Sequence, residues 1–87
     1  MISSTVTFHG LRKQDIENLA DVMSQTDGWD ISHPDENKWL AEAPDTRIWV
    51  HFNGENQSAD FDFEQVPEKS AAWLRGHVYE KLRTLTP

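Results

Sequence analysis

Two neighbouring stretches between residues 47 and 64 alternate between apolar and polar side chains, and this pattern limits what the chain can fold into. The apolar positions are Ile48, Val50 and Phe52 in the first stretch and Ala59, Phe61 and Phe63 in the second. Side chains of a β-strand point to opposite faces in turn, so both stretches are predicted to be strands with one buried face. Asn53-Gly54 begins a reversal between them, which predicts a hairpin whose exact register the sequence leaves open.

Further elements follow from similar patterns on either side of this hairpin. Val6 and Phe8 alternate with polar residues, which predicts a first strand. Residues 12–25 and 67–85 have helical periodicity, and Gly28 is suited to end the first of these helices. The two predicted apolar stripes are Ile16, Leu19, Ala20 and Met23, and Ala71, Leu74, Val78, Leu82 and Leu85.

The segment between the first helix and the hairpin is harder to interpret. Residues 29–32 are predicted to form a short strand, and residues 33–37 a turn, because Pro, Asp and Asn favour turn geometry. Lys38 to Ala43 fits either a strand or a helical turn started by Pro34, and we favour the strand. Residues 44–46 are predicted to form another turn.

These elements predict one α+β domain over residues 1–87, with the order β-α-β-β-β-β-α. The expected architecture is an antiparallel sheet with two helices packed on one face, which leaves the other face open. The 87 residues include no cysteine, so no disulfide or thiolate metal site supports the core. Apolar runs are short and no leader pattern precedes residue 10, so we expect no membrane segment and a cytoplasmic protein.

Charge is distributed unevenly along the chain. Residues 14–64 contain thirteen acidic residues and two basic ones, Lys38 and Arg47, whereas both ends are slightly basic and the net charge is −7. Such asymmetry bears on the choice of partner rather than on the fold. The acidic block indicates a basic partner, although solubility or adaptation to high salt would also favour surface acids.

The open face of the predicted sheet is the candidate binding site. Asp60, Asp62 and Glu64 would form a row of carboxylates there, and the neighbouring strand would add Arg47, Trp49 and His51. Carboxylates at regular spacing can meet arginines and lysines that otherwise hold phosphates, which suggests nucleic-acid mimicry. The alternative is an ordinary solvated strand that protects the sheet from aggregation.

The four tryptophans divide into two pairs. Trp29 and Trp39 are expected to fill the core or its rim, the usual place for an aromatic residue in a small domain. Trp49 and Trp73 are less easily buried and are candidate anchors for a partner. Gly76, in the middle of the second helix, costs about 1 kcal/mol relative to alanine and hints at close approach by another chain.

No arrangement of residues predicts catalysis or a cofactor. The four histidines are scattered, no nucleophile or phosphate-loop motif is present, and Asp60-Phe61-Asp62 alone is weak support for a metal site. The basic residues near the end of the chain are spread around one helix, so direct binding of nucleic acid is not expected. These residues are Lys69, Arg75, Lys81 and Arg83.

The leading hypothesis is a non-enzymatic inhibitor that occupies the basic nucleic-acid channel of a larger protein. In general type the chain is similar to small acidic inhibitors such as anti-CRISPR proteins and immunity proteins, without a shared motif. The alternatives are an immunity protein or antitoxin that neutralises a cationic toxin, and a homodimerisation module whose open face pairs with itself around Trp49.

Overall fold

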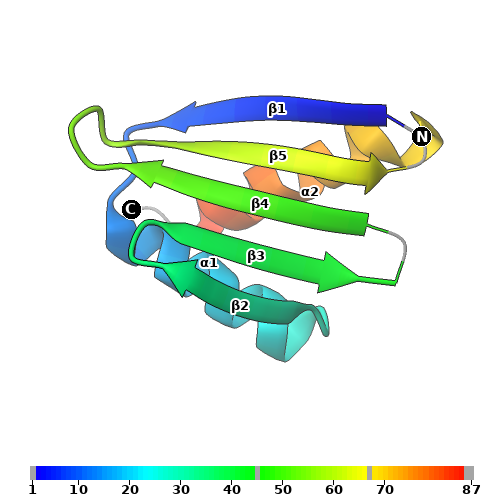
Figure 1. Cartoon of the computed structure of the whole chain (residues 1–87), viewed down its shortest axis with the longest axis horizontal. Helices are drawn as coiled ribbons and strands as arrows, with labels where there is room; N and C mark the ends of the chain where they lie inside the picture. Colours follow the sequence, from blue (N-terminus) through cyan, green and yellow to red (C-terminus); the bar gives the residue numbers. More distant parts are fainter. Residues whose placement is uncertain (1, 45, 67, 86–87) are drawn as a thin grey trace.

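The fold is an α+β domain with a five-stranded sheet and two helices (Figure 1). A computed structural model describes the backbone of residues 2–44, 46–66 and 68–85, and the side chains of residues 5–44, 46–64 and 75–84. The elements follow in the order β1 (Ile2–His9), α1 (Lys13–Thr26), β2 (Asp30–Asp35), β3 (Lys38–Ala43), β4 (Thr46–Asn53), β5 (Ser58–Val66) and α2 (Glu68–Leu85). The predicted fold class and element order are therefore confirmed.

All neighbouring strands of the sheet are antiparallel, and their spatial order is β1-β5-β4-β3-β2. Strands β2 to β5 form a meander of consecutive hairpins, and β1 adds to the free side of β5. The two edge strands, β1 and β2, are thus joined in sequence by α1, which crosses behind the sheet (Figure 1).

The β4–β5 hairpin has the faces that the alternating sequence predicts. Phe61 pairs with Val50 and Phe63 with Ile48, and all four side chains are buried. Four residues, 54–57, connect the strands, and this even number keeps the apolar positions of both strands on one face. Leu11 donates its backbone N–H to the carbonyl of Gln57 at 2.8 Å, which ties the end of β1 to this turn.

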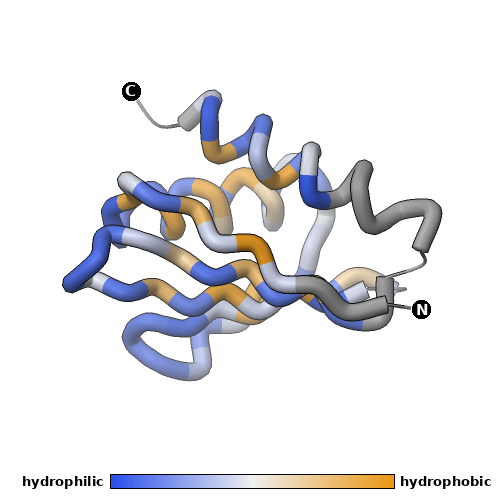
Figure 2. Tube along the Cα trace, turned by 90° about the horizontal axis from the view of Figure 1, so that it is seen from above, coloured by the Kyte–Doolittle hydropathy of each residue, from blue (hydrophilic) through white to orange (hydrophobic). Residues whose placement is uncertain are grey.

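Both helices lie on one side of the sheet, and the apolar positions lie between the two layers (Figure 2). Ile16, Leu19 and Met23 of α1 and Val78 and Leu82 of α2 are buried there, as their helical spacing predicts. The remaining buried apolar side chains are Leu11, Trp39, Ala41, Ile48, Val50, Ala59, Phe61 and Phe63. No helix in the described part of the chain has a stretch apolar enough to cross a bilayer.

A buried carboxylate fixes the start of α1. Asp15 is 0% exposed, and one carboxylate oxygen accepts the backbone N–H of Arg12 at 2.8 Å. The other oxygen accepts an N–H of the Arg12 guanidinium at 3.1 Å. Burial acts to raise the pKa of Asp15, but the hydrogen bonds and charge of Arg12 outweigh it and the pKa lies below its usual value.

The end of α1 is tied to α2 by side chains. The Met23 carbonyl accepts the N–H groups of Asp27 and Trp29, and Gly28 between them has the left-handed φ of +73° that favours glycine. The Asp27 carboxylate meets His77 at 3.1 Å and Lys81 at 3.7 Å, both from α2. These polar contacts join the two helices at the edge of the core.

Two details differ from the sequence prediction. Residues 33–35 continue β2 instead of forming a turn, because β2 is an edge strand and tolerates Pro34 together with a register irregularity between Ser32 and Asp35. Thr46 likewise begins β4 rather than ending a turn. Lys38–Ala43 is strand β3, as favoured, and the helical alternative is wrong.

The fate of the tryptophans is partly as expected. Trp39 is buried and stacks on the exposed His33, with ring centroids 4.6 Å apart, and Trp29 is half-buried against the core. Trp49 lies half-buried on the other face of the sheet. The side chains of Trp73, Ala71, Leu74, Lys69 and Leu85 are outside the described residues.

Shortening Phe61 tests how much of the stability depends on β5. Phe61→Ala is expected to lower the free energy of unfolding by about 3 to 5 kcal/mol, because the ring is fully buried and its removal leaves a cavity. Urea unfolding followed by far-UV circular dichroism measures this change. Glu80→Ala, at an exposed position of α2, is the control and should change stability by less than about 0.5 kcal/mol.

Replacing Asp15 tests the buried carboxylate. A pKa that is lowered by folding adds stability above the unfolded value of about 3.9, and this contribution is lost as the pH falls through the folded pKa. Asp15→Asn should therefore destabilise the protein by about 1 to 3 kcal/mol at pH 7. The difference from the native protein should shrink in unfolding measurements at acidic pH. A difference that stays constant down to pH 2 would contradict the assigned charge of Asp15.

Candidate protein-binding face of the sheet

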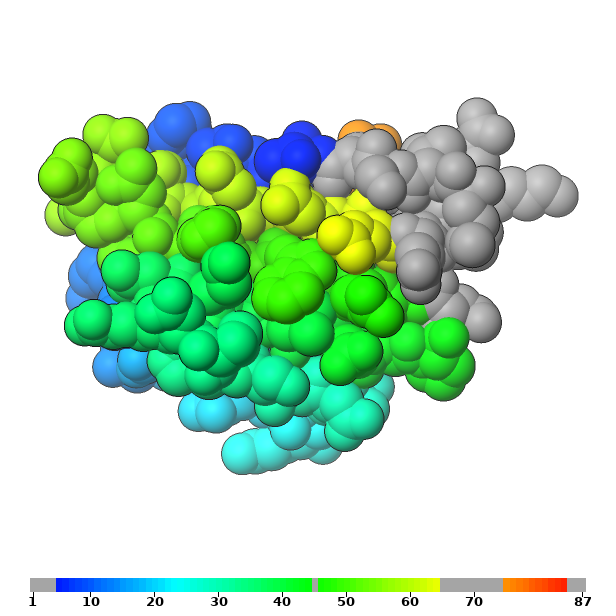
Figure 3. Space-filling model, in the orientation of Figure 1, coloured from blue at the N-terminus to red at the C-terminus, as the bar shows by residue number. Residues whose placement is uncertain are grey.

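The face of the sheet that points away from the helices is here called the open face. Figure 3 shows the side chains of β5, β4 and β3 at its surface. Its described positions are Thr5 and Thr7 of β1, Asp60, Asp62 and Glu64 of β5, Arg47, Trp49 and His51 of β4, Lys38, Leu40 and Glu42 of β3, and Asp30, Ser32 and Asp35 of β2. Among them are six carboxylates and two permanently basic side chains, so the face is strongly negative.

The three carboxylates of β5, here called the acidic row, lie where the sequence places them. They pair across to β4, with Asp60 opposite His51, Asp62 opposite Trp49 and Glu64 opposite Arg47. Carboxylates two residues apart on a strand are about 6.5 to 7 Å apart along it. The structure thus brings together six of the seven predicted site residues, and the side chain of the seventh, Trp73, is outside the described residues.

Two threonines of β1 hold the first two carboxylates of the row. The Thr5 hydroxyl donates to Asp62 at 2.5 Å, and the Thr7 hydroxyl donates to Asp60 at 2.6 Å. These bonds orient both carboxylates on the surface instead of leaving them free to rotate. Sequence reasoning missed both threonines, because it could not place β1 beside β5.

Glu64 has a different environment from Asp60 and Asp62. Arg47 lies between Glu64, 4.0 Å from its Nη1, and Glu42, 3.7 Å from its Nε. All three side chains are about 40% exposed, so solvent weakens these ion pairs. The positive charge of Arg47 offsets part of the negative charge at this end of the row.

Trp49 occupies the middle of the open face. Leu40 lies opposite it on β3 and Asp62 on β5, and the Lys38 ammonium lies 5.8 Å from the centre of the indole ring. A half-buried indole offers apolar area without the cost of ordering a long, flexible side chain. Among the described positions of the open face, Trp49 is the only large aromatic side chain.

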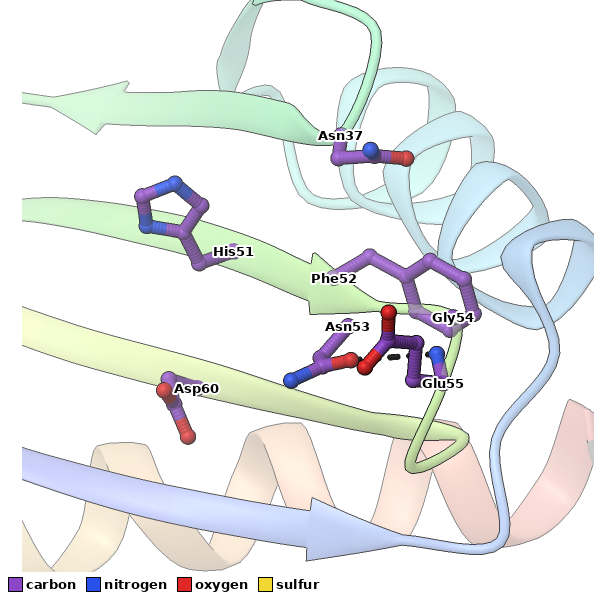
Figure 4. Close-up of a pocket in the computed structure, with 7 residues that line it drawn as sticks. All are labelled: Asn37, His51, Phe52, Asn53, Gly54, Glu55 and Asp60. Atoms are coloured by element: carbon purple, nitrogen blue, oxygen red, sulfur yellow. Dashed lines mark hydrogen bonds between the residues drawn. The ribbon is translucent and has the colours of Figure 1, made fainter.

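A hollow of about 510 Å³ lies at the Asp60 end of the acidic row (Figure 4). Its walls come from the β2–β3 turn, the strands β4 and β5, and the turn between them: Asn37, His51, Phe52, Asn53, Gly54, Glu55 and Asp60. The side-chain Oδ1 of Asn53 accepts the backbone N–H groups of Glu55 at 3.0 Å and Asn56 at 3.3 Å, which fixes the turn. Within the described residues, no three His, Asp or Glu side chains are placed to hold a metal ion.

Comparisons with known proteins add no family to this description. No protein-family model matches the sequence, and a search of curated proteins finds no match. What the protein does must therefore be inferred from the chemistry of its surface.

Removing one threonine hydroxyl tests whether β1 orients the acidic row. Thr7→Val should lower the free energy of unfolding by about 0.5 to 1 kcal/mol, because an exposed hydrogen bond to a carboxylate is lost. Thr7→Ser keeps the hydroxyl and should retain most of that stability. Equal unfolding midpoints in urea for the two variants would show that the bond contributes nothing.

Proposed function

We propose that this protein is a small, non-enzymatic inhibitor that binds a larger protein through the open face and occupies its basic nucleic-acid-binding surface. The observation that carries the proposal is the acidic row on a face that neither helix covers. The described part of this face carries six carboxylates and two basic side chains and has Trp49 near its centre.

Carboxylates can take the place of phosphates in such a surface because the same side chains bind both. Arginine forms paired hydrogen bonds with carboxylate or phosphate oxygens, and lysine attracts either as a point charge. Asp60 and Asp62 present oxygens at a fixed spacing, as a phosphate backbone does. Their threonine partners reduce the conformational freedom that binding would otherwise remove.

The members of the face are expected to contribute unequally. Arg47 offsets the charge of Glu64, so an arginine of the larger protein would compete with Arg47 for that carboxylate. Asp60 has no such basic neighbour within ion-pair distance among the described residues, and it lines the hollow of about 510 Å³. We therefore assign the larger electrostatic contributions to Asp60 and Asp62, with Trp49 as the apolar anchor.

Charge reversal on the acidic row tests the proposal. The triple variant Asp60→Lys, Asp62→Lys, Glu64→Lys should lose the partner that the native protein captures from nuclease-treated lysate. The captured partner, once purified, should bind a labelled DNA or RNA duplex, and the native protein should displace that duplex. Attraction of opposite charges also predicts faster association at low salt than at high salt.

The matched control changes the net charge by the same amount as the acidic-row variant, but at positions outside the open face. Glu17→Lys, Asp21→Lys, Glu80→Lys alters three acids of the helical layer. This control should capture and compete like the native protein. Loss of binding in both triple variants would show that net charge alone decides the interaction. Capture that survives reversal of the acidic row would overturn the proposed role of the open face.

A further inference from the structure

The two edges of the sheet are built differently. The β2 edge carries Asp30, Pro34 and Asp35, and these charged and proline residues discourage another strand from pairing with it. The β1 edge, Ile2–His9, has eight residues and contains no proline, aspartate, glutamate, lysine or arginine. It therefore lacks the proline and charged side chains that usually protect an exposed edge strand, and its register irregularity with β5 lies near its start, between Ile2 and Ser4.

An apolar hollow adjoins the end of β1. It has a volume of about 180 Å³ and lies between β1 and α2, with Phe8, Leu11, Tyr79 and Leu82 as its apolar walls. The Tyr79 ring lies 5.9 Å from that of Phe8 and is 51% exposed, more than any other large hydrophobic side chain of the described residues. Apolar surface thus continues from the edge strand onto the helix.

Charge also favours this side of the molecule for self-association. The acidic residues are concentrated between residues 14 and 64, whereas the segments that form β1 and α2 lie largely outside that block. Pairing along β1 would bring together strands without acidic side chains of their own, whereas pairing along β2 would bring Asp30 and Asp35 of both copies together. The open face is the least suited to contact another copy.

We propose that β1 is a dimerisation edge that pairs antiparallel with β1 of a second copy. A neutral strand is its own partner in an antiparallel, twofold pair, because the same backbone groups are exchanged in both directions. The two sheets would become one sheet of ten strands with all helices on one side. A pairing centred near Thr5 brings the start of the partner's β1 alongside Phe8, next to the apolar hollow.

The dimer would double the open-face surface that the proposed function uses. Dimerisation itself does not depend on that function. Three strand spacings, or about 14 Å, would separate the two β5 strands, so two acidic rows would lie on one continuous face. Self-association can thus succeed or fail whatever the open face binds.

Two lysine substitutions on one rung of the sheet form a matched test. Thr5 and Ser32 are the end members of the rung Thr5-Asp62-Trp49-Leu40-Ser32, on β1 and β2 respectively. Thr5→Lys would place two ammonium groups opposite one another across the proposed interface, whereas Ser32→Lys would not.

Light scattering from micromolar to millimolar concentration should give the mass of two chains for the native protein and Ser32→Lys. Thr5→Lys should raise the dissociation constant at least tenfold, and Tyr79→Ser should also weaken the dimer.

Hydrogen exchange keeps the test decisive if Thr5→Lys fails to fold. In the native protein, amides of β1 should exchange more slowly as concentration rises, while those of β2 should not change. A single-chain mass at every concentration would overturn the proposal and leave the edge for a strand of another protein. Equal dissociation constants for Thr5→Lys and Ser32→Lys would overturn it as well. So would amide exchange rates in β1 that do not change with protein concentration.

Discussion

The burial of Phe61 and Phe63 is the interaction on which the rest of the structure depends. Both rings lie within the core at 0% and 1% exposure, and they fix which face of β5 meets the helices. Because side chains alternate along a strand, the same contact forces Asp60, Asp62 and Glu64 to the opposite face. A slip of one residue would bury three carboxylates and expose two phenylalanines, which is energetically prohibitive. The core and the acidic row are thus two outcomes of one constraint.

Features that depend on a local residue pattern could be predicted from the sequence. Features that depend on pairing between distant segments could not. Alternation identified both faces of β4 and β5, and helical spacing identified the buried residues Ile16 and Val78. No local pattern indicates that β1 lies beside β5, because Thr5 and Asp62 are 57 positions apart. The threonine bonds to the acidic row were therefore out of reach. Pro34 misled the assignment of β2, since the same residue suits a turn or an edge strand.

The acidic block does not act as a uniform charge. Asp15 is buried and bonded at the start of α1, and Asp27 is occupied by His77 and Lys81 between the helices. These two carboxylates belong to the architecture and are directed away from the open face. Other acids, such as Asp21 and Glu80, are exposed on the helices, and only those on the strands have a spacing that the sheet sets. A count of acids in the sequence overstates the field at the surface and misses its order.

The placement of β1 at the far side of β5 has a consequence for how the chain folds during synthesis. Strands β2 to β5 pair with neighbours in sequence, so each hairpin can close over a short loop soon after it is made. β1 leaves the ribosome before all of them and has no partner until β5 follows some fifty residues later. Its neutral, alternating segment must therefore stay unpaired longest, and its docking onto β5 is the slow closure that completes the sheet.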